Sequence, residues 1–326
     1  MKKIENITIR NYKSLEDVEI KGCKTFNLFI GPPNVGKSNI IEALSFMAVP
    51  YLFQMRRSIG TIFRIERSSA LFYNGKVSHP IEIKAGDYNM QIQNTALNQI
   101  NVIARHLEEQ QSFGIVDLKV KKGFSEYSNF KPYLYEEHDN RSWTTQVDMP
   151  FLCPWDGNNM MQVLQQNESL KHYFANLLKE YDLQLTFDLA QQEVRILKPI
   201  DETSSFIIPY VALADSIKRL IFYKVAVDSN KDSVLMFEEL EAHSYPPYIS
   251  KITQTIIQNP SNQYFITTHS PYVINEFLED QSLDVAIHLV DYKEGKTIVK
   301  TLTNDEMAEV YNYGIDLFFN TEAFLD

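Results

Sequence analysis

The sequence predicts an α/β fold with a parallel core sheet, and two stretches carry that prediction. Residues 27–44, NLFIGPPNVGKSNIIEAL, run from an apolar strand through a glycine loop directly into a helical pattern. From about residue 205 onward, a helix, an apolar strand, a second helix and a second strand alternate. Such alternation is typical of βαβ units, whose strands are parallel.

The first fifty residues contain the elements that surround the glycine loop. Residues 4–9 alternate apolar and polar, which predicts a half-buried strand. Two further strands are expected at 18–22 and 25–31, the second leading into the loop. The apolar spacing of 38–49 is helical, and the helix is expected to stop before Pro50.

The middle of the chain has a different pattern. Between residues 54 and 150, short alternating runs are interrupted by turn residues, and one polar helix is expected around 96–111. An amphipathic helix at 169–181 and a hairpin at 183–197 follow. We therefore expect one domain over 1–326. Its core would be 1–50 with 205–290, 51–204 would be an inserted lobe, and 291–326 a C-terminal strand and helix.

Composition limits the classes of protein to consider. The 326 residues are 44% hydrophobic and 22% charged, which is ordinary for a globular protein. The formal net charge of −11 means that contact with nucleic acid needs a local basic patch. Cys23 and Cys153 form no CxxC pair, which argues against a disulfide scaffold or zinc ribbon. With no signal peptide or membrane-spanning run visible, we expect a soluble cytoplasmic protein without membrane contact.

The glycine loop matches the phosphate-binding pattern G-x-x-x-x-G-K-[ST] without a mismatch. Glycines let the backbone turn tightly and bring its N–H groups close to phosphate oxygens, and the next helix points its N-terminus at them. Lys37 would bridge the β- and γ-phosphates of ATP, and Ser38 would give its hydroxyl to Mg²⁺. The candidate nucleotide-binding residues are Gly31, Pro32, Pro33, Asn34, Val35, Gly36, Lys37, Ser38 and the following Asn39.

Two further strand ends carry polar groups. SVLMFEELEAH brings an apolar strand to Glu238, a candidate for Mg²⁺, and Glu239, a candidate general base. In such enzymes we expect the strand beside the phosphate-loop strand to end in this acid. QYFITTHSP ends the next βα unit at His269. In a parallel sheet this places His269 at the same edge, where it can sense the γ-phosphate.

These motifs together resemble the ABC-type ATPases related to RecF, the OLD proteins and the SMC proteins. EELEAHSYP is similar to their E-E-P-E-A-H-L-H-P segment, TTHSP to their switch histidine, and ITIRNYKSLEDVEI to their opening strand. The resemblance implies a P-loop NTPase fold of ABC-ATPase type with a parallel core sheet, an antiparallel β subdomain and an inserted α/β lobe. It also implies a homodimer in which each ATP lies between the phosphate loop of one subunit and the signature of the other.

The sequence departs from the family pattern at the signature. Where the family has L-S-x-G, this chain has Leu213-Ala214-Asp215-Ser216, so Ser216 stands at the glycine and Lys218 and Arg219 follow it. Ser216 could donate its own hydroxyl to the nucleotide of the other subunit. The Q-loop glutamine has no clear counterpart, and Gln54, Gln91 and Gln93 are the candidates. The departures argue against fast hydrolysis and leave nucleotide binding intact.

Two functions follow from the resemblance. The first is an ATPase switch in DNA-linked processes such as anti-phage defence or repair, driving a separate effector such as a nuclease or toxin. Because the stretch after His269 is short, we expect no fused nuclease domain in this chain. The alternative is a nucleotide-gated protein-binding module with little turnover and no DNA contact. For the first, the candidate DNA contact is a basic cluster, for which a salt-bridged surface is an equally good interpretation: Arg56, Arg57, Arg64 and Arg67.

Overall fold

A computed structural model describes residues 2–50, 52, 58–121, 129–135, 149–190 and 193–325. The chain divides into two compact units. The first contains residues 1–132, 232–240 and 261–326, and the second contains 133–231 and 241–260. This division differs from the expected one, because strands from the expected lobe at 51–204 join the sheet of the N-terminal strands in the first unit.

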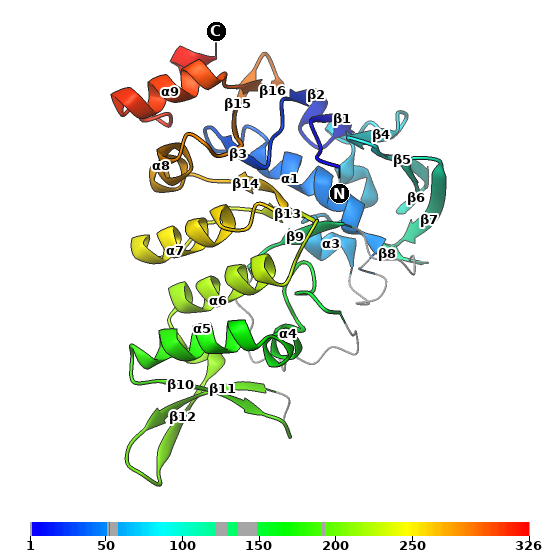
Figure 1. Ribbon diagram of the computed structural model, residues 1–326. Coiled ribbons are helices and arrows are strands. Elements are labelled where there is room, and N and C mark those ends of the chain that lie inside the picture. The colour runs from blue at the N-terminus through cyan, green and yellow to red at the C-terminus, as the bar shows by residue number, and fades with distance from the viewer. Residues whose placement is uncertain are drawn as a thin grey trace. The chain divides into compact units, whose positions relative to one another are not determined.

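A mixed sheet forms the centre of the first unit (Figure 1). Among the described residues its strand order is β16-β15-β3-β14-β13-β9. The neighbours from β15 through β3 and β14 to β13 are parallel, and β16 is antiparallel to β15. The strands are β3 (Phe26–Ile30), β9 (Phe130–Tyr133), β13 (Val234–Phe237), β14 (Gln263–Thr267), β15 (Val285–Lys293) and β16 (Lys296–Thr301).

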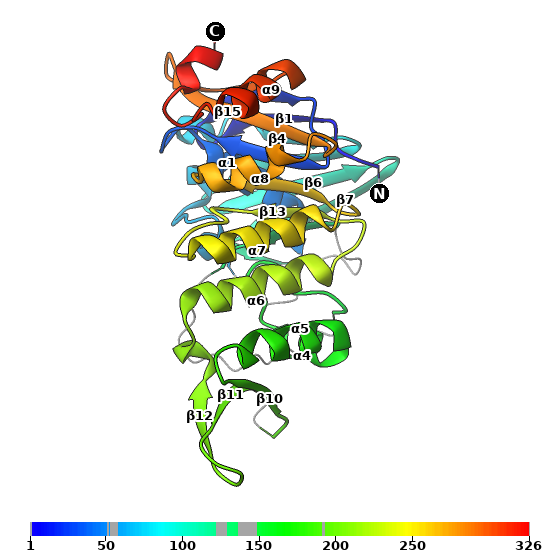
Figure 2. The same ribbon diagram turned by 60° about the vertical axis from the view of Figure 1, so that its left-hand side comes forward.

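The parallel strands are almost continuously apolar, as strands covered on both faces are. All residues of β3, β13 and β14 are buried. The helices of this unit are α1 (Lys37–Ser45), α3 (Ile59–Ile62), α8 (Pro271–Glu279) and α9 (Asn304–Tyr313). Helix α1 follows β3 directly and packs on β13 and β14. Helices α8 and α9 lie side by side in both views (Figure 2).

A second sheet of the first unit is antiparallel throughout, with the described strands in the order β2-β1-β4-β5-β6-β7-β8. These strands are β1 (Asn6–Tyr12), β2 (Leu15–Lys21), β4 (Ile81–Ala85), β5 (Tyr88–Ala96), β6 (Gln99–His106), β7 (Glu109–Val116) and β8 (Lys119–Val120). This sheet is the antiparallel β subdomain that the sequence predicted.

The prediction of a polar helix at 96–111 is wrong, because this stretch forms the end of β5, the whole of β6, the start of β7 and the two turns that join them. Asn98 and Leu107 adopt positive φ values of 53° in turns that pair Ala96 with Gln99 and His106 with Glu109. Two-residue turns of this kind join antiparallel strands, and burial within β6 alternates accordingly. The apolar residues have a period of two, which the sequence reading mistook for helical spacing.

The second unit joins helices to a three-stranded antiparallel sheet of order β10-β11-β12. Helix α5 and the hairpin of β10 and β11 confirm the amphipathic helix and hairpin predicted there. The elements are α4 (Met160–Gln166), α5 (Glu168–Lys179), β10 (Gln184–Asp188), β11 (Glu193–Pro199), β12 (Ser205–Pro209), α6 (Asp215–Asp228) and α7 (Pro246–Ile257).

The α/β fold class with its parallel core and antiparallel subdomain is therefore confirmed. No helix within the described parts of the chain has the length and apolar character needed to cross a bilayer.

Candidate nucleotide site at the carboxyl edge of the sheet

The phosphate loop joins β3 to α1 and needs glycine at both ends. Gly31 has φ 149°, and a Cβ there would lie 2.0 Å from the carbonyl oxygen of Val290. Gly36 has φ 109°, and a Cβ there would lie 2.7 Å from Oγ1 of Thr297. Both positions therefore exclude a side chain for steric as well as conformational reasons. The loop is shaped against the β15–β16 hairpin, a contact that the motif does not show.

The ammonium of Lys37 lies inside this loop. Its Nζ donates to the carbonyl oxygens of Gly31 at 2.8 Å and Pro32 at 2.6 Å, and the residue is buried. The partial negative charges of these two carbonyl oxygens thus stabilise the positive charge of the buried ammonium. Ser38 follows in the first turn of α1 and is half-buried. This is the arrangement in which a lysine can meet an anion enclosed by the loop.

Hydrogen bonds from residues outside the motif hold the phosphate loop in place. Oγ1 of Thr297 donates to the carbonyl oxygen of Val35 at 2.8 Å and lies 3.4 Å from Oγ of Ser14. Asn39 donates from Nδ2 to the same Ser14 oxygen at 2.8 Å, so it contacts the opening strand segment. The sequence reading missed Thr297, because nothing in its local pattern separates it from an ordinary strand threonine.

The acids and the histidine come to the same sheet edge as the loop. Phe237 pairs with Ile266, and Thr267 pairs with Phe29, so the parallel strands β13, β14 and β3 end together. Directly after β13, Glu238 is half-buried and Glu239 is exposed. His269 follows β14 and is also exposed.

The order of these strands corrects one expectation. The strands beside β3 are β15 and β14. Strand β14 leads to His269, and the acidic strand β13 lies one position further away. A hydrogen bond links the two ends, since the Glu239 N–H donates to Oγ1 of Thr267 at 2.9 Å. Glu239 itself has a left-handed φ of 47°, so Thr267 helps to hold an unfavourable backbone conformation.

An unexpected ion-pair network reaches Glu238 through Arg64. The guanidinium donates to Oε1 of Glu42 from Nε at 3.1 Å and Nη2 at 2.7 Å. The same Nη2 lies 3.2 Å from each carboxylate oxygen of Glu238. Glu42 belongs to α1, its side chain is only 8% exposed, and it also accepts from Lys13. One arginine therefore connects a buried acid behind the phosphate loop to the candidate metal acid.

The network explains the electrostatics of this edge. Partial burial lowers the pKa of Arg64, but the carboxylates of Glu238 and Glu42 outweigh it and the pKa is raised. The sequence analysis did not single out Glu42. An acid within the apolar helix pattern IIEAL is nevertheless a usable signal, since a buried carboxylate needs hydrogen-bond or charge partners.

Of the expected basic cluster, Arg64 is not available for a DNA contact in this structure, because two carboxylates bind its guanidinium. Arg67 is exposed. Arg56, Arg57 and Gln54 lie outside the described residues. Gln91 and Gln93 lie in β5 of the antiparallel sheet, with Gln91 half-buried and Gln93 exposed.

The signature region belongs to the second unit. Oγ of Ser216 accepts from the Tyr245 N–H at 2.9 Å, so this hydroxyl serves the loop that follows the acidic strand. Lys218 is buried and pairs with Asp215 at 2.8 Å. Arg219 is buried with its guanidinium 4.4 Å from the Tyr135 ring centre. Neither basic side chain faces outward as a partner contact would require.

The residues present fit Mg²⁺ with ATP. Mg²⁺ in such sites takes hard oxygen ligands, few of them from protein, and the phosphates and water supply the rest. Ser38 and Glu238 supply a hydroxyl and a carboxylate of this kind. Within the described residues no three His, Cys, Asp or Glu side chains form a metal-binding group.

Comparisons with known proteins identify the family and support the fold. Residues 1–224 match the AAA ATPase domain family. An ATP/GTP phosphatase of Helicobacter pylori (strain ATCC 700392 / 26695) is 23% identical over 375 aligned positions that cover 98% of both chains. The DNA replication and repair protein RecF of Streptococcus gordonii (strain Challis) is 28% identical over 108 residues, 33% of this chain and 28% of that protein.

Solved structures show the same fold. The SMC head bound to the C-terminal winged-helix domain of ScpA has a TM-score of 0.53 at 14% identity, covering 94% of this chain and 99% of that one. An SMC head with an extended coiled coil, bound to the C-terminal domain of ScpA derived from Pyrococcus furiosus, has a TM-score of 0.52 at 11% identity, covering 96% and 99%. The chain belongs to the AAA ATPase domain family, has the fold of the SMC heads and is similar in part of its sequence to RecF.

Proposed function

We propose that this ATPase is a dimeric switch that binds and hydrolyses ATP with Mg²⁺ in DNA-linked processes, anti-phage defence or DNA repair, and drives a separately encoded effector such as a nuclease or toxin. One observation carries the proposal. The buried Lys37 ammonium lies within the phosphate loop, at the sheet edge where the strands that lead to Glu238, Glu239 and His269 also end. The RecF relatives, named as DNA replication and repair proteins, support the link to DNA.

In this proposal each side chain has one role. Lys37 exchanges the carbonyls of Gly31 and Pro32 for phosphate oxygens. Ser38 and Glu238 hold Mg²⁺, which neutralises phosphate charge when bound. Glu239 is the general base, and its exposure gives water access to its carboxylate. His269 senses the γ-phosphate from the end of the neighbouring strand.

The dimer is the part of the proposal that depends on the second unit. Each ATP would be enclosed by the phosphate loop of one subunit and the start of α6 in the other. Because the Ser216 hydroxyl already accepts from Tyr245 and the Lys218 side chain is buried, the backbone at the start of α6 becomes the main candidate for that contact. A contact made by the backbone alone would hold the ATP of the other subunit weakly, which favours slow ATP hydrolysis.

The alternative function is a nucleotide-gated protein-binding module with little turnover. The pairing of Arg64 with two acids leaves a weaker basic surface and so favours this alternative. In the first function, DNA would contact Arg56, Arg57 and Arg67. Steady-state hydrolysis with and without DNA at two salt concentrations separates the two, because phosphate contacts release counterions and weaken with salt.

The test of nucleotide binding is calorimetry with a non-hydrolysable ATP analogue and Mg²⁺. Lys37→Ala should abolish measurable binding while the circular dichroism spectrum stays unchanged. Lys84→Ala, an exposed lysine in β4, is the matched control and should bind as the wild type does. Unchanged affinity in Lys37→Ala would refute the phosphate-loop assignment.

A further inference from the structure

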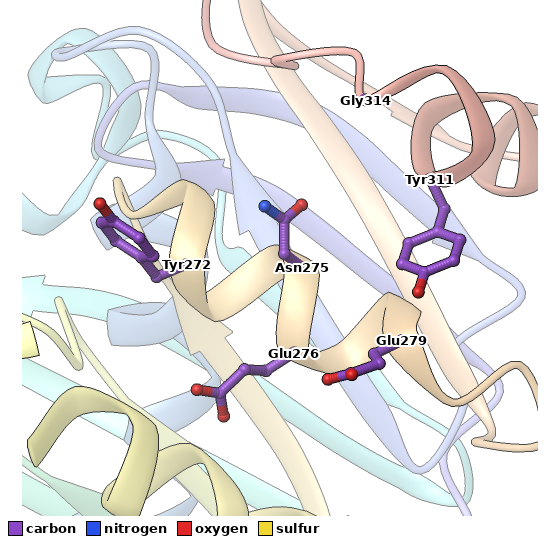
Figure 3. A pocket seen from close by; sticks show the side chains of 6 residues that line it. All are labelled: Tyr272, Asn275, Glu276, Glu279, Tyr311 and Gly314. Carbon is purple, nitrogen blue, oxygen red and sulfur yellow. The ribbon is translucent and has the colours of Figure 1, made fainter. Parts of the chain in front are cut away.

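A hollow between α8 and α9 lies outside the nucleotide site. It has a volume of ≈ 300 Å³ and is lined by Tyr272, Asn275, Glu276, Glu279, Tyr311 and Gly314 (Figure 3). The four residues from α8 are spaced three or four apart, so they share one face of the helix. The opposite face is buried through Val273, Ile274, Phe277 and Leu278. The hollow is thus the solvent side of a well-anchored helix.

Aromatic rings are unusually exposed around this hollow. Tyr272 is 66% exposed and Tyr311 39%, and both line the hollow. Figure 3 shows Tyr272 and Tyr311 at opposite ends of the row with the two glutamates between them. Tyrosine combines large contact area with a polar tip and is enriched at binding surfaces. Such exposure therefore marks a candidate interaction surface.

The charge of this surface selects the chemistry of its ligand. Residues 271–284 and 301–326 contain no lysine or arginine. Their acids are Glu276, Glu279, Asp280, Asp284, Asp305, Glu306, Glu309, Asp316, Glu322 and Asp326. Nearby, Lys24 is bonded to Asn304 at 3.0 Å and Lys300 to Glu306 at 3.0 Å. The surface repels phosphates and anionic lipids and attracts cations.

We propose that the hollow between α8 and α9 binds an arginine-bearing segment of a partner protein. A guanidinium can stack on a tyrosine ring and donate two parallel hydrogen bonds to a carboxylate, and this row has a tyrosine at each end with two glutamates between them (Figure 3). Arginine suits the site better than lysine, because the planar group uses both kinds of contact.

The position of α8 would let a partner bound at this docking site respond to the bound nucleotide. The helix starts at Pro271, two residues after His269, the proposed γ-phosphate sensor. A partner on α8 would therefore lie next to the switch and could respond to the nucleotide state. In this respect the inference rests on the proposed function, since it names the surface where the effector would bind.

The test measures a labelled nine-residue peptide of alternating glycine and arginine by fluorescence anisotropy at low salt, without nucleotide. The wild type should bind it, bind the lysine version less tightly, and not bind the glutamate version. Glu276→Gln with Glu279→Gln should weaken binding at least ~10-fold, the scale of two charge-assisted contacts. The matched control is Glu108→Gln with Glu109→Gln, two exposed acids at the β6–β7 turn, which should change affinity less than ~2-fold if charge at the hollow is what matters.

A second pair of variants tests the ring. Tyr311→Phe should retain binding and Tyr311→Ala should lose ~2- to 5-fold, the scale of a surface cation–π contact. Equal weakening by both glutamine pairs would overturn the proposal, because only the overall negative charge would then matter. No binding by the wild type would overturn it as well. Lys37→Ala should bind the peptide normally, so loss of ATP binding and loss of the docking site are separate results.

Discussion

Arg64→Met should destabilise the first unit, because it removes two hydrogen bonds from a carboxylate that is nearly buried. Breaking a buried ion pair by removing one partner costs about 3–5 kcal/mol. Two features reduce that figure here. Lys13 and the Tyr12 hydroxyl remain on Glu42, and the Arg64 side chain is 57% exposed, so water can replace part of it. We expect a loss of about 1–2 kcal/mol.

The assay is urea unfolding followed by two signals. Trp155 is buried in the second unit, and a Trp143→Phe background removes the other tryptophan, which lies outside the described residues. Tryptophan fluorescence therefore follows the second unit, whereas far-ultraviolet circular dichroism follows both. Arg64→Met should shift the dichroism transition to lower urea and leave the fluorescence transition in place.

Arg67→Met is the matched control, since this exposed arginine is three residues away. It should stay within about 0.5 kcal/mol of the wild type. Glu42→Ala should cost more than Arg64→Met, because it leaves the 16% exposed Lys13 without its carboxylate. If Arg64→Met and Arg67→Met behave alike, the network does not stabilise the first unit and our reasoning is refuted.

Three further predictions concern catalysis, assembly and pH. Glu239→Gln should bind ATP and hydrolyse it ~100-fold more slowly; if only Glu238→Gln does so, the two roles are reversed. Mixing Lys37→Ala with Ser216→Arg subunits, each inactive alone and each folded, should restore about a quarter of the activity if each site joins two subunits; no recovery despite subunit exchange would exclude Ser216 as a contact across the dimer. Burial lowers the pKa of His288 from 6.5 to about 3. The unfolded chain therefore takes up the proton first, and stability should be full above pH ~6.5 and fall towards pH 3 by up to ~1.4 kcal/mol per unit. His288→Gln should flatten the part of the slope between pH 6.5 and 5, and an unchanged slope would contradict this role.

The core elements could be predicted because local signals agree there. The glycine loop, its strand and its helix follow one another directly, and the apolar strands β13 and β14 end in polar residues that the sequence displays. The stretch at 96–111 was misread because its polar composition hides a period of two.

The order of strands and the Arg64 network could not be predicted, and the reason is the same for both. Neighbours in a sheet need not be neighbours in sequence, and β14 separates β3 from β13 although it follows both along the chain. Arg64 lies 22 positions from Glu42 and 174 from Glu238. Only folding brings such groups together, so the sequence left open whether Arg64 is an exposed DNA contact or part of an ion pair, and the structure shows the ion pair.

The bond between Arg64 and Glu238 has a consequence for the order of events during nucleotide loading. If Glu238 holds Mg²⁺ as proposed, the same oxygens cannot also bind a guanidinium, so metal uptake and release of Arg64 from Glu238 would be thermodynamically linked. Each event must favour the other by the same free energy. Arg64 would then lose its bond to Glu238 when the metal binds and keep its bonds to Glu42. Under the proposed function, the segment after α3 would therefore be held by two acids when the site is empty and by one when it is loaded.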